Sequence, residues 1–202
     1  MTEDLYNFKL RFPEYLNENI SKMTLGDLTI NLSNRNKENR QYKQYSVTNT
    51  QGFVPQEDIF VDRQDSDKDL RQYKMLCGGE FAYNPARINV GSIARYDGTE
   101  ECLISSLYVC FKQKDIVDSD WLLYFLKSKR ALFYYNLYGE GGVRIYLFYP
   151  NFARIHVRVP ILEEQRKIAS TIESITAKLD QEIILLSSYQ KQRKYLLQKM
   201  FI

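Results

Sequence analysis

Residues 163–199 decide the fold, and they read EEQRKIASTIESITAKLDQEIILLSSYQKQRKYLLQK. The stretch contains neither proline nor glycine, and apolar side chains recur in it at alternating steps of four and three residues. This period predicts one long α-helix with an apolar stripe along one side. About 37 residues at 1.5 Å per residue give a rod roughly 55 Å long. The remaining 160 or so residues cannot cover such a rod along its whole length, so the stripe predicts a second helix as its partner.

The stripe is therefore predicted to lie between two chains. It has ten positions from Ile168 to Met200, of which eight are apolar. The two interruptions are Glu182, which Ile183 can replace, and Arg193. The side chains expected in the interface are Ile168, Ile172, Ile175, Leu179, Ile183, Leu186, Leu196 and Met200. The alternative is a helix that packs wholly on its own domain.

The charges of the helix predict the direction of its partner. Residues 163–182 carry five acids and three bases, whereas residues 183–200 carry four bases and no acid. An antiparallel partner of the same sequence brings the acidic half against the basic half, which favours an antiparallel coiled-coil-like pair. Pro160 is expected in the first turn, and Glu163 and Glu164 suit the positive N-terminal end of the helix dipole.

The part of the chain before the helix predicts an α+β domain with a mixed sheet. Short alternating or apolar runs predict strands at residues 44–48, 80–84, 107–112 and 154–159. Helix-capping patterns occur at Ser66-x-x-Asp69 and at Asp118 or Ser119. The expected organisation is a domain at residues 1–160, followed by a dimerisation or spacer helix at residues 161–202.

Composition limits the class of protein. Hydrophobic residues make up 44% of the chain and charged residues 26%, as in a globular protein with a core. The three cysteines, Cys77, Cys102 and Cys110, form no C-x-x-C pair and lie in apolar stretches, which predicts reduced core thiols in a cytoplasmic protein. The acidic start and the lack of a run of 18 apolar residues predict neither a signal peptide nor a membrane span.

Charge is segregated along the chain, and the basic segments are candidates for nucleic-acid binding. The net charge is +3; residues 31–51 and 127–158 are basic, and residues 57–69 are acidic. Basic segments suit phosphate backbones, although a solvated face has the same composition. Arginine, asparagine and lysine suit base edges and phosphates, and glycines at 139–142 allow close approach of a phosphate. The candidate DNA-binding residues are Asn34, Arg35, Asn36, Lys37, Arg40, Tyr42, Lys43, Arg144 and Tyr146.

Several kinds of catalytic site have no support in the sequence. The single histidine, His156, has no partner for a metal site, and it is expected to be structural or at the surface. Neither G-x-x-x-x-G-K nor G-x-G-x-x-G occurs, and no lysine has an acid two residues before it, as common metal-dependent nucleases require. The sequence therefore predicts a binding protein that is not an enzyme and holds no metal or cofactor.

Six blocks of the sequence, in order, give a family resemblance. They are LRFPEY (10–15), LGDL (25–28), GEFAYNP (79–85), RINVGSIA (87–94), VPILEEQRKIA (159–169) and LLQKMF (196–201). Together they resemble half of a specificity subunit of type I restriction-modification systems, with one target recognition domain and one conserved spacer helix.

The resemblance implies a DNA-reading scaffold without catalysis of its own. Family members carry two recognition domains joined by two antiparallel helices, and each domain reads one half of a split target. Methyltransferase subunits bring S-adenosylmethionine, and restriction subunits bring ATP- and Mg-dependent cleavage. With one domain and one helix, this chain is expected to act as a homodimer on double-stranded DNA or to be a truncated piece of a longer subunit. The alternatives are a protein–protein adaptor and a free-standing DNA-binding regulator.

Overall fold

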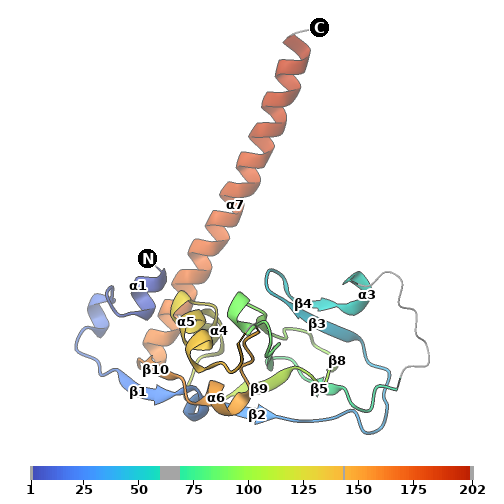
Figure 1. Cartoon of the computed structure of the whole chain (residues 1–202). Helices are drawn as coiled ribbons and strands as arrows, with labels where there is room; N and C mark the ends of the chain where they lie inside the picture. The colour runs from blue at the N-terminus through green and yellow to red at the C-terminus, as the bar shows by residue number, and fades with distance from the viewer. Residues whose placement is uncertain (1, 60–68, 143, 201–202) are drawn as a thin grey trace.

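The computed structural model describes residues 2–59, 69–142 and 144–200, and it consists of a domain and a projecting helix (Figure 1). Helix α7 (Leu162–Met200) is 39 residues long and leaves the domain as a bare rod. The predicted long helix is thus confirmed. Pro160, expected in its first turn, lies two residues before its start. None of the helices in the described ranges combines the length and apolar character of a membrane span.

The strands of the domain form three sheets. An antiparallel sheet has the order β2-β9-β6-β7, with β2 (Thr29–Leu32), β9 (Val109–Gln113), β6 (Phe81–Tyr83) and β7 (Ile93–Arg95). A mixed sheet has the order β4-β3-β8-β5, with β4 (Gly52–Pro55), β3 (Gln44–Thr48), β8 (Cys102–Ile104) and β5 (Lys74–Leu76). Its β3–β8 pair is parallel. Next to the start of α7, β1 (Ser21–Thr24) pairs with β10 (His156–Val159). The α+β prediction with a mixed sheet is confirmed.

Short helices connect and flank the strands. They are α1 (Thr2–Tyr6), α2 (Leu25–Leu28), α3 (Gln56–Ile59), α4 (Ser119–Leu126), α5 (Lys129–Tyr138) and α6 (Tyr149–Ala153), with 3₁₀ turns η1 (Pro13–Tyr15) and η2 (Ile88–Val90). The main core combines Phe81 and Phe111 of the sheet, whose rings stack, with Trp121 of α4 and Phe152 of α6. A smaller core, with Leu76, Cys102 and Cys110, lies against the mixed sheet.

Several predictions from local sequence patterns are confirmed, among them four strands and one helix cap. Strand β3 coincides with the predicted 44–48, and the other three predicted strands overlap β6, β9 and β10 with shifted ends. Asp118 caps α4, as predicted, by accepting hydrogen bonds from the backbone N–H groups of Asp120 and Trp121.

The helix predicted after Ser66 is wrong for its described part. Ser66 itself lies outside the described residues. Residues 69–73 form a turn, in which the Asp69 carboxylate accepts a hydrogen bond from the Arg71 N–H at 3.0 Å. Leu70, buried at 1% exposure, is fixed by a hydrogen bond from its N–H to the Asn39 side chain. An aspartate that bonds its own backbone two residues on favours a turn over a helix.

The cysteines are all free thiols, but only two of them lie in a core. Cys102 and Cys110 are buried, and burial raises the pKa of both to about 12. Cys77 is exposed, contrary to the prediction, because it follows the edge strand β5 and precedes the turn at Gly78 and Gly79.

The root of α7, residues 162–172, is built into the domain. Ile168, Ala169 and Ile172 belong to the main core, which therefore extends beyond the predicted boundary at residue 160. Glu164 is fully buried and pairs with Arg11, whose guanidinium donates to both carboxylate oxygens at 2.8 and 2.7 Å. The buried Gln165 donates to the Pro160 carbonyl and accepts from the Asp118 N–H. These bonds fix the direction in which the rod leaves the domain.

Candidate DNA interface

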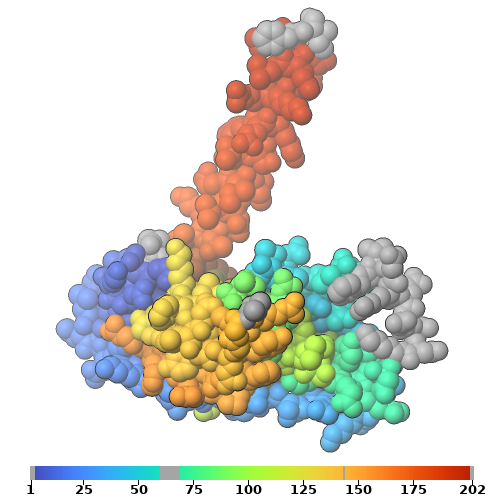
Figure 2. Space-filling model, viewed as in Figure 1, coloured from blue at the N-terminus to red at the C-terminus, as the bar shows by residue number. Residues whose placement is uncertain are grey.

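A cleft of about 750 Å³ opens on the face of the domain shown in Figure 2, where the segments around residues 107 and 146 lie side by side. It collects residues from three separate parts of the chain. Its lining consists of Asn84, Pro85, Ala86, Arg87, Leu107, Arg144, Tyr146 and Phe148. Two of these, Arg144 and Tyr146, are predicted DNA-binding residues.

Backbone pairing holds the walls of the cleft in place. Strand β6 ends at Tyr83, so Asn84 and Pro85 emerge from the centre of the antiparallel sheet. The Leu147 N–H donates to the Pro85 carbonyl at 3.0 Å, which ties the second wall to the first. The loop that carries Arg144 is closed by two backbone hydrogen bonds between Glu140 and Tyr146, at 2.8 and 2.7 Å.

A glycine in this loop serves the turn itself. Gly141 has φ +115°, and a Cβ at this position would lie 2.2 Å from the Arg144 carbonyl oxygen. Only glycine adopts this conformation without strain. The loop is thus a tight turn that presents Arg144, and Gly141 is explained without a bound phosphate.

The cleft carries positive charge that the protein does not neutralise. Arg87 and Arg144 are both exposed, and within the described ranges neither has an ion-pair partner. Glu140, in the same loop as Arg144, accepts a hydrogen bond from the Asn151 amide at 2.6 Å and forms no ion pair with either arginine among the described residues. Free guanidinium groups suit phosphates and the O6/N7 edge of guanine.

Exposed apolar groups flank these arginines. Tyr146 and Phe148 stack with their ring planes 10° apart, and they are 38% and 50% exposed. Leu107 is 77% exposed on the opposite side. Apolar side chains at a DNA surface contact thymine methyl groups or wedge between base steps.

A smaller recess of about 230 Å³ adjoins the cleft and shares Asn84 and Arg87 with it. Its other lining residues are Ser46, Val47, Thr48, Asn49, Ile59, Ser92 and Tyr108. Most of these carry hydroxyl or amide groups, which donate to and accept from base edges. The two recesses together form a surface with arginine, amide, hydroxyl and aromatic groups.

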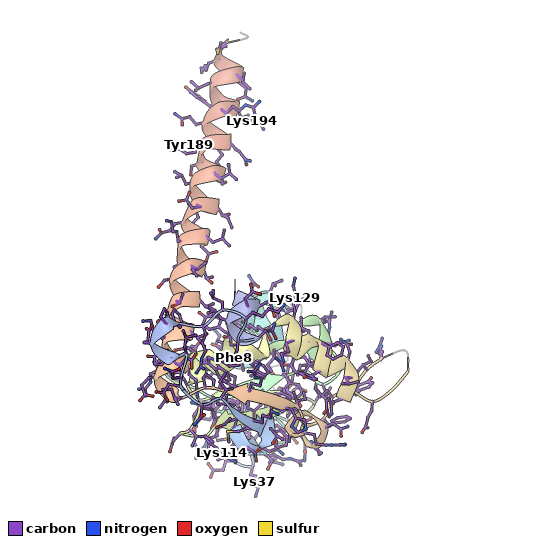
Figure 3. All side chains as sticks on the ribbon, turned by 90° about the vertical axis from the view of Figure 1, so that its left-hand side faces the viewer. Phe8, Lys37, Lys114, Lys129, Tyr189 and Lys194 are labelled. Carbon is purple, nitrogen blue, oxygen red and sulfur yellow. The ribbon has the colours of Figure 1, made fainter. Side chains whose placement is uncertain are left out.

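The predicted loop at residues 34–43 lies elsewhere. None of its described residues lines either recess. Figure 3 shows Lys37 at the end of the domain farthest from the tip of α7. The structure therefore separates the predicted DNA-binding residues into two places, the loop and the cleft.

Asn36 is not available to DNA, contrary to the prediction. It is fully buried, its amide donates to the Arg40 carbonyl at 2.8 Å, and its oxygen accepts from the Arg40 N–H at 2.9 Å. Both polar ends of the side chain are used to close the loop. The sequence missed this because asparagine suits tight turns as well as base edges.

Two bases of the loop are paired within the chain. Hydrogen bonds with Tyr42 and Glu38 raise the pKa of the Arg40 guanidinium, and a 2.7 Å ion pair with Glu57 raises the pKa of Lys43. Asn34, Arg35 and Lys37 are exposed, and Arg35 donates to Gln72 at 2.9 Å. In the folded chain, acids therefore offset part of the positive charge that the loop presents to solvent.

Three of the six bases in the second basic segment, 127–158, are committed to the fold. Arg158 lies 4.7 Å from the centre of the Phe8 ring, Arg154 lies over Tyr138, and Arg130 donates to Asn7. Burial lowers the pKa of Lys127. Arg144 remains as an exposed, unpaired base at the cleft.

The sequence missed Asn84, Arg87, Leu107 and Phe148. A weak signal existed, because Asn84 and Pro85 end a predicted strand and Arg87 follows within three residues. Nothing in the sequence indicated that this turn meets residues 144–148, because such long-range contacts depend on how the sheet and helices pack.

A family model for the type I restriction modification DNA specificity domain matches residues 17–185 of the chain. This match covers more than half of the sequence. The chain belongs to the type I DNA specificity family. The prediction of a DNA-recognition component in place of a catalytic one is thus confirmed at the level of the family.

Solved structures of type I specificity proteins share the fold. A chain described under complex assembly and conformational transition of the type I R-M system matches 96% of this chain and 49% of its own length, with TM-score 0.59 and 17% identity. The HsdS subunit from Thermoanaerobacter tengcongensis matches 89% and 43%, with TM-score 0.54 and 16% identity. The S subunit from M. genitalium matches 91% and 45%, with TM-score 0.57 and 13% identity.

This member of the specificity family spans about half the length of the solved chains that it matches. No curated protein sequence matches it significantly. Two of the family-like blocks meet at the root of α7: block 10–15 supplies Arg11, and block 159–169 supplies Glu164. In block 25–28, Asp27 forms a reciprocal cap with Thr24 at the start of α2.

The predicted helix interface divides into two groups. Ile168 and Ile172 are 1% and 4% exposed in the core of their own domain, so they are not available to a second chain, contrary to the prediction. The root packs against α4 of its own domain. Ile175 is half-buried. The remaining five are exposed: Leu179, Ile183, Leu186, Leu196 and Met200.

His156 is exposed on β10. Within the ranges that the structure describes, no three His, Cys, Asp or Glu side chains are grouped so that they could hold a metal ion.

Proposed function

We propose that this chain is a sequence-specific DNA-binding subunit of a type I restriction-modification complex that acts as a homodimer in the cytoplasm. The cleft is the main DNA-contacting surface, and the loop at 34–43 contacts the backbone. Methyltransferase subunits, and in some complexes restriction subunits, supply S-adenosylmethionine, ATP and Mg. In this organisation, residues 1–160 with the root of α7 recognise DNA, and the remainder of 161–202 joins two copies.

The observation that carries the DNA-reading proposal is the pair of unneutralised arginines in the cleft. Arg87 and Arg144 come from two separate segments of the lining, which also contains Asn84 and the stacked Tyr146 and Phe148. Phosphate contacts position a protein on DNA, and side chains at base edges give it specificity. A cleft with both kinds of group, in a member of a DNA specificity family, supports base reading.

An exposed apolar patch supports the docking of a methyltransferase subunit. Phe133 and Leu137, one turn apart on α5, are 63% and 62% exposed, and Val90 on the adjacent η2 is 54% exposed. Exposed apolar groups that cluster in this way mark protein contacts. Phe133→Asp is expected to abolish co-purification with the methyltransferase and to leave duplex binding by the chain intact.

The target is expected to be an inverted repeat of two short half-sites with an unread spacer. Two identical chains related by a two-fold axis present identical reading surfaces in opposite orientations. The test is to map methylated adenines in DNA from cells that express the chain with its methyltransferase. An asymmetric bipartite motif would mean that the chain pairs with a different half, and a continuous short motif would contradict a bipartite reader.

Duplex binding then tests the cleft. On the mapped site, Arg87→Ala or Arg144→Ala is expected to lose about 1–3 kcal/mol if the arginine reads a base, and to lower the salt slope by about 1 if it contacts a phosphate. Arg166→Ala is the matched control, because this arginine is exposed on α7, away from the cleft. Unchanged binding in both cleft variants would remove the cleft from the proposal.

The same measurements separate the alternatives. Salt-dependent duplex binding without any co-purifying methyltransferase would favour a free-standing regulator. Partner binding without duplex binding would favour an adaptor.

A further inference from the structure

The distal part of α7, residues 175–200, carries an apolar stripe that the domain does not cover. Beyond the half-buried Ile175, the stripe is open to solvent. The exposed fractions are 57% for Leu179, 57% for Leu186, 59% for Tyr189, 51% for Leu196 and 74% for Met200. Figure 3 shows Tyr189 and Lys194 on the bare rod, well away from the domain.

We propose that this stripe pairs antiparallel with the same stripe of a second copy in one defined register, in which Glu182 faces Arg193 of the second copy. The inference rests on the homodimer in the proposed function, and it adds the register and the residue pair that sets it. Both residues are exposed, and neither has an ion-pair partner in its own chain among the described residues.

The heptad pattern restricts the possible registers. With Leu179 and Leu186 at a positions, the residues at a are 172, 179, 186, 193 and 200, and the residues at d are 168, 175, 182, 189 and 196. In an antiparallel pair related by a two-fold axis, the partner's stripe runs in the opposite direction, so its steps of four and three residues occur in reverse order. Each a residue of one helix therefore faces a d residue of the other. One register, with Met200 opposite Ile161, needs both Ile168 and Ile172, which the domain buries. Three others with substantial overlap satisfy the condition, in which Met200 faces Ile168, Ile175 or Glu182 of the other copy.

The structure also removes the first of these three registers. It would require Ile168 and Ile172 in the seam, and both are already buried in the core of the domain. The third register places Glu182 against Met200 and Arg193 against Tyr189. It therefore leaves both charges in apolar layers, and Ile175 and Leu179 stay uncovered.

The second register matches every layer. Its layers are Ile175 with Met200, Leu179 with Leu196, Glu182 with Arg193, and Leu186 with Tyr189, and each occurs twice by symmetry. The two charged interruptions of the stripe thus face each other. Unpaired charges in an apolar seam are strongly unfavourable, whereas a single polar layer specifies register.

The surrounding charges favour the same direction. Residues 188–200 carry Lys191, Arg193, Lys194 and Lys199 without an acid, whereas residues 175–187 carry Asp180, Glu182 and Lys178. An antiparallel pair places these two halves together, and a parallel pair would place Glu182 against Glu182 and Arg193 against Arg193.

The register also sets a distance. The two-fold axis passes between residues 187 and 188, so the two Ile172 residues, where the rods leave the domains, lie roughly 47 Å apart along the helices at 1.5 Å per residue. At about 3.4 Å per base pair, this spacing corresponds to about 14 base pairs between equivalent points of the two half-sites.

Charge reversal in the full-length chain tests the pair. Glu182→Arg and Arg193→Glu are each expected to raise the dimer Kd at least ~100-fold, because each places two like-charged pairs in the seam. The double variant restores the opposite charges and is expected to dimerise like the wild type. Equimolar mixing of the two single variants is expected to give a heterodimer. Sedimentation velocity at micromolar concentration measures all four.

Matched controls carry the same charge changes outside the seam. Asp180→Arg and Lys191→Glu lie at b and f positions and are exposed, so both variants are expected to remain dimeric. Circular dichroism checks that every variant keeps the helix. Tagged copies of each single variant identify the heterodimer in the mixture.

Three results would overturn the inference: a monomeric wild type, single reversals that dimerise like the wild type, or a double variant that stays monomeric. The last two leave the homodimer intact and reject the register alone. A monomeric wild type rejects the self-pairing, and duplex binding by its domain still tests DNA recognition separately.

Discussion

The root and the distal part of α7 have the same apolar period and opposite surroundings. In the root, Ile168 and Ile172 lie in the core and Glu164 forms a buried ion pair. In the distal part, Leu179 and Leu186 are both 57% exposed. One continuous pattern therefore serves two purposes: its first turns attach the rod to the domain, and the remainder presents a surface for another helix. Periodicity identifies a covered face, but it does not identify what covers it.

The difference extends to the charged residues of the helix. Glu164 finds its partner within the chain, because the segment at 10–15 lies across the root. Glu182 has no such segment beside it, and its proposed partner belongs to a second copy. Changes in the root should therefore alter folding of the single chain, and changes in the distal part should alter association only.

The largest expected effect is on association. Leu186→Glu places two carboxylates in the seam at about 3 kcal/mol each, so the dimer Kd should rise about ten-thousand-fold. Unfolding of the domain should not change, because Leu186 is exposed in the single chain. Light scattering across a concentration series measures the first effect and urea unfolding the second. A dimer that survives this change would place the interface elsewhere.

A smaller effect is expected when the buried ion pair of the root is broken. Arg11→Met leaves the Glu164 carboxylate buried without a partner and should lower the free energy of unfolding by roughly 3–5 kcal/mol. Adding Glu164→Gln removes the charge and should recover part of this loss. Arg166→Met, at an exposed arginine of the same root, is the control. If Arg11→Met unfolds at the wild-type urea concentration, the pair does not anchor the helix.

The next smaller effect on the free energy of unfolding is expected when an apolar contact is removed from the root. Ile168→Ala is expected to lower the free energy of unfolding by about 2–4 kcal/mol, because it leaves a cavity in the core. Leu179→Ala makes a comparable truncation about three turns further along and should have little effect on a dilute, monomeric sample. Equal losses for the two variants would mean that the distal part is not free in the single chain.

The smallest effect is expected at an exposed ion pair of the root. Lys167 pairs with Glu14 and lies 5.2 Å from the centre of the Phe12 ring. Solvent screens this pair, so Lys167→Met should leave the urea midpoint close to that of the wild type. A loss as large as that of Arg11→Met would show that the exposed contacts, and not the buried pair, hold the rod in place.

Local patterns predicted those elements whose residues settle their own structure. Residues 44–48 alternate and form β3, and Asp118 precedes an apolar run and caps α4. The same reasoning failed for Asn36 and for Asp69. In both cases the side chain bonds to nearby backbone, and only the position of the chain around it decides between a turn and another role.

The lining of the cleft, which is the proposed DNA-binding surface, was predicted only in part, because it is assembled from distant segments. Arg144 and Tyr146 were found because they follow a glycine-rich turn. Arg87 lies 57 residues earlier in the chain and meets them through backbone pairing between Leu147 and Pro85. Net charge along the sequence was also a poor guide, because folding pairs Lys43 with Glu57 and uses three of the six 127–158 bases in packing.

The sequence by itself determined the long helix, the period of its stripe and the opposite charges of its two halves, because each depends on spacings within a few turns. It also contains the proposed complementarity of Glu182 and Arg193, which follows from position along one helix. Only the tertiary structure decided where the covered part of the stripe ends and which arginines stay free at the cleft. Burial and pairing depend on segments brought together from across the chain, and no local period encodes those contacts.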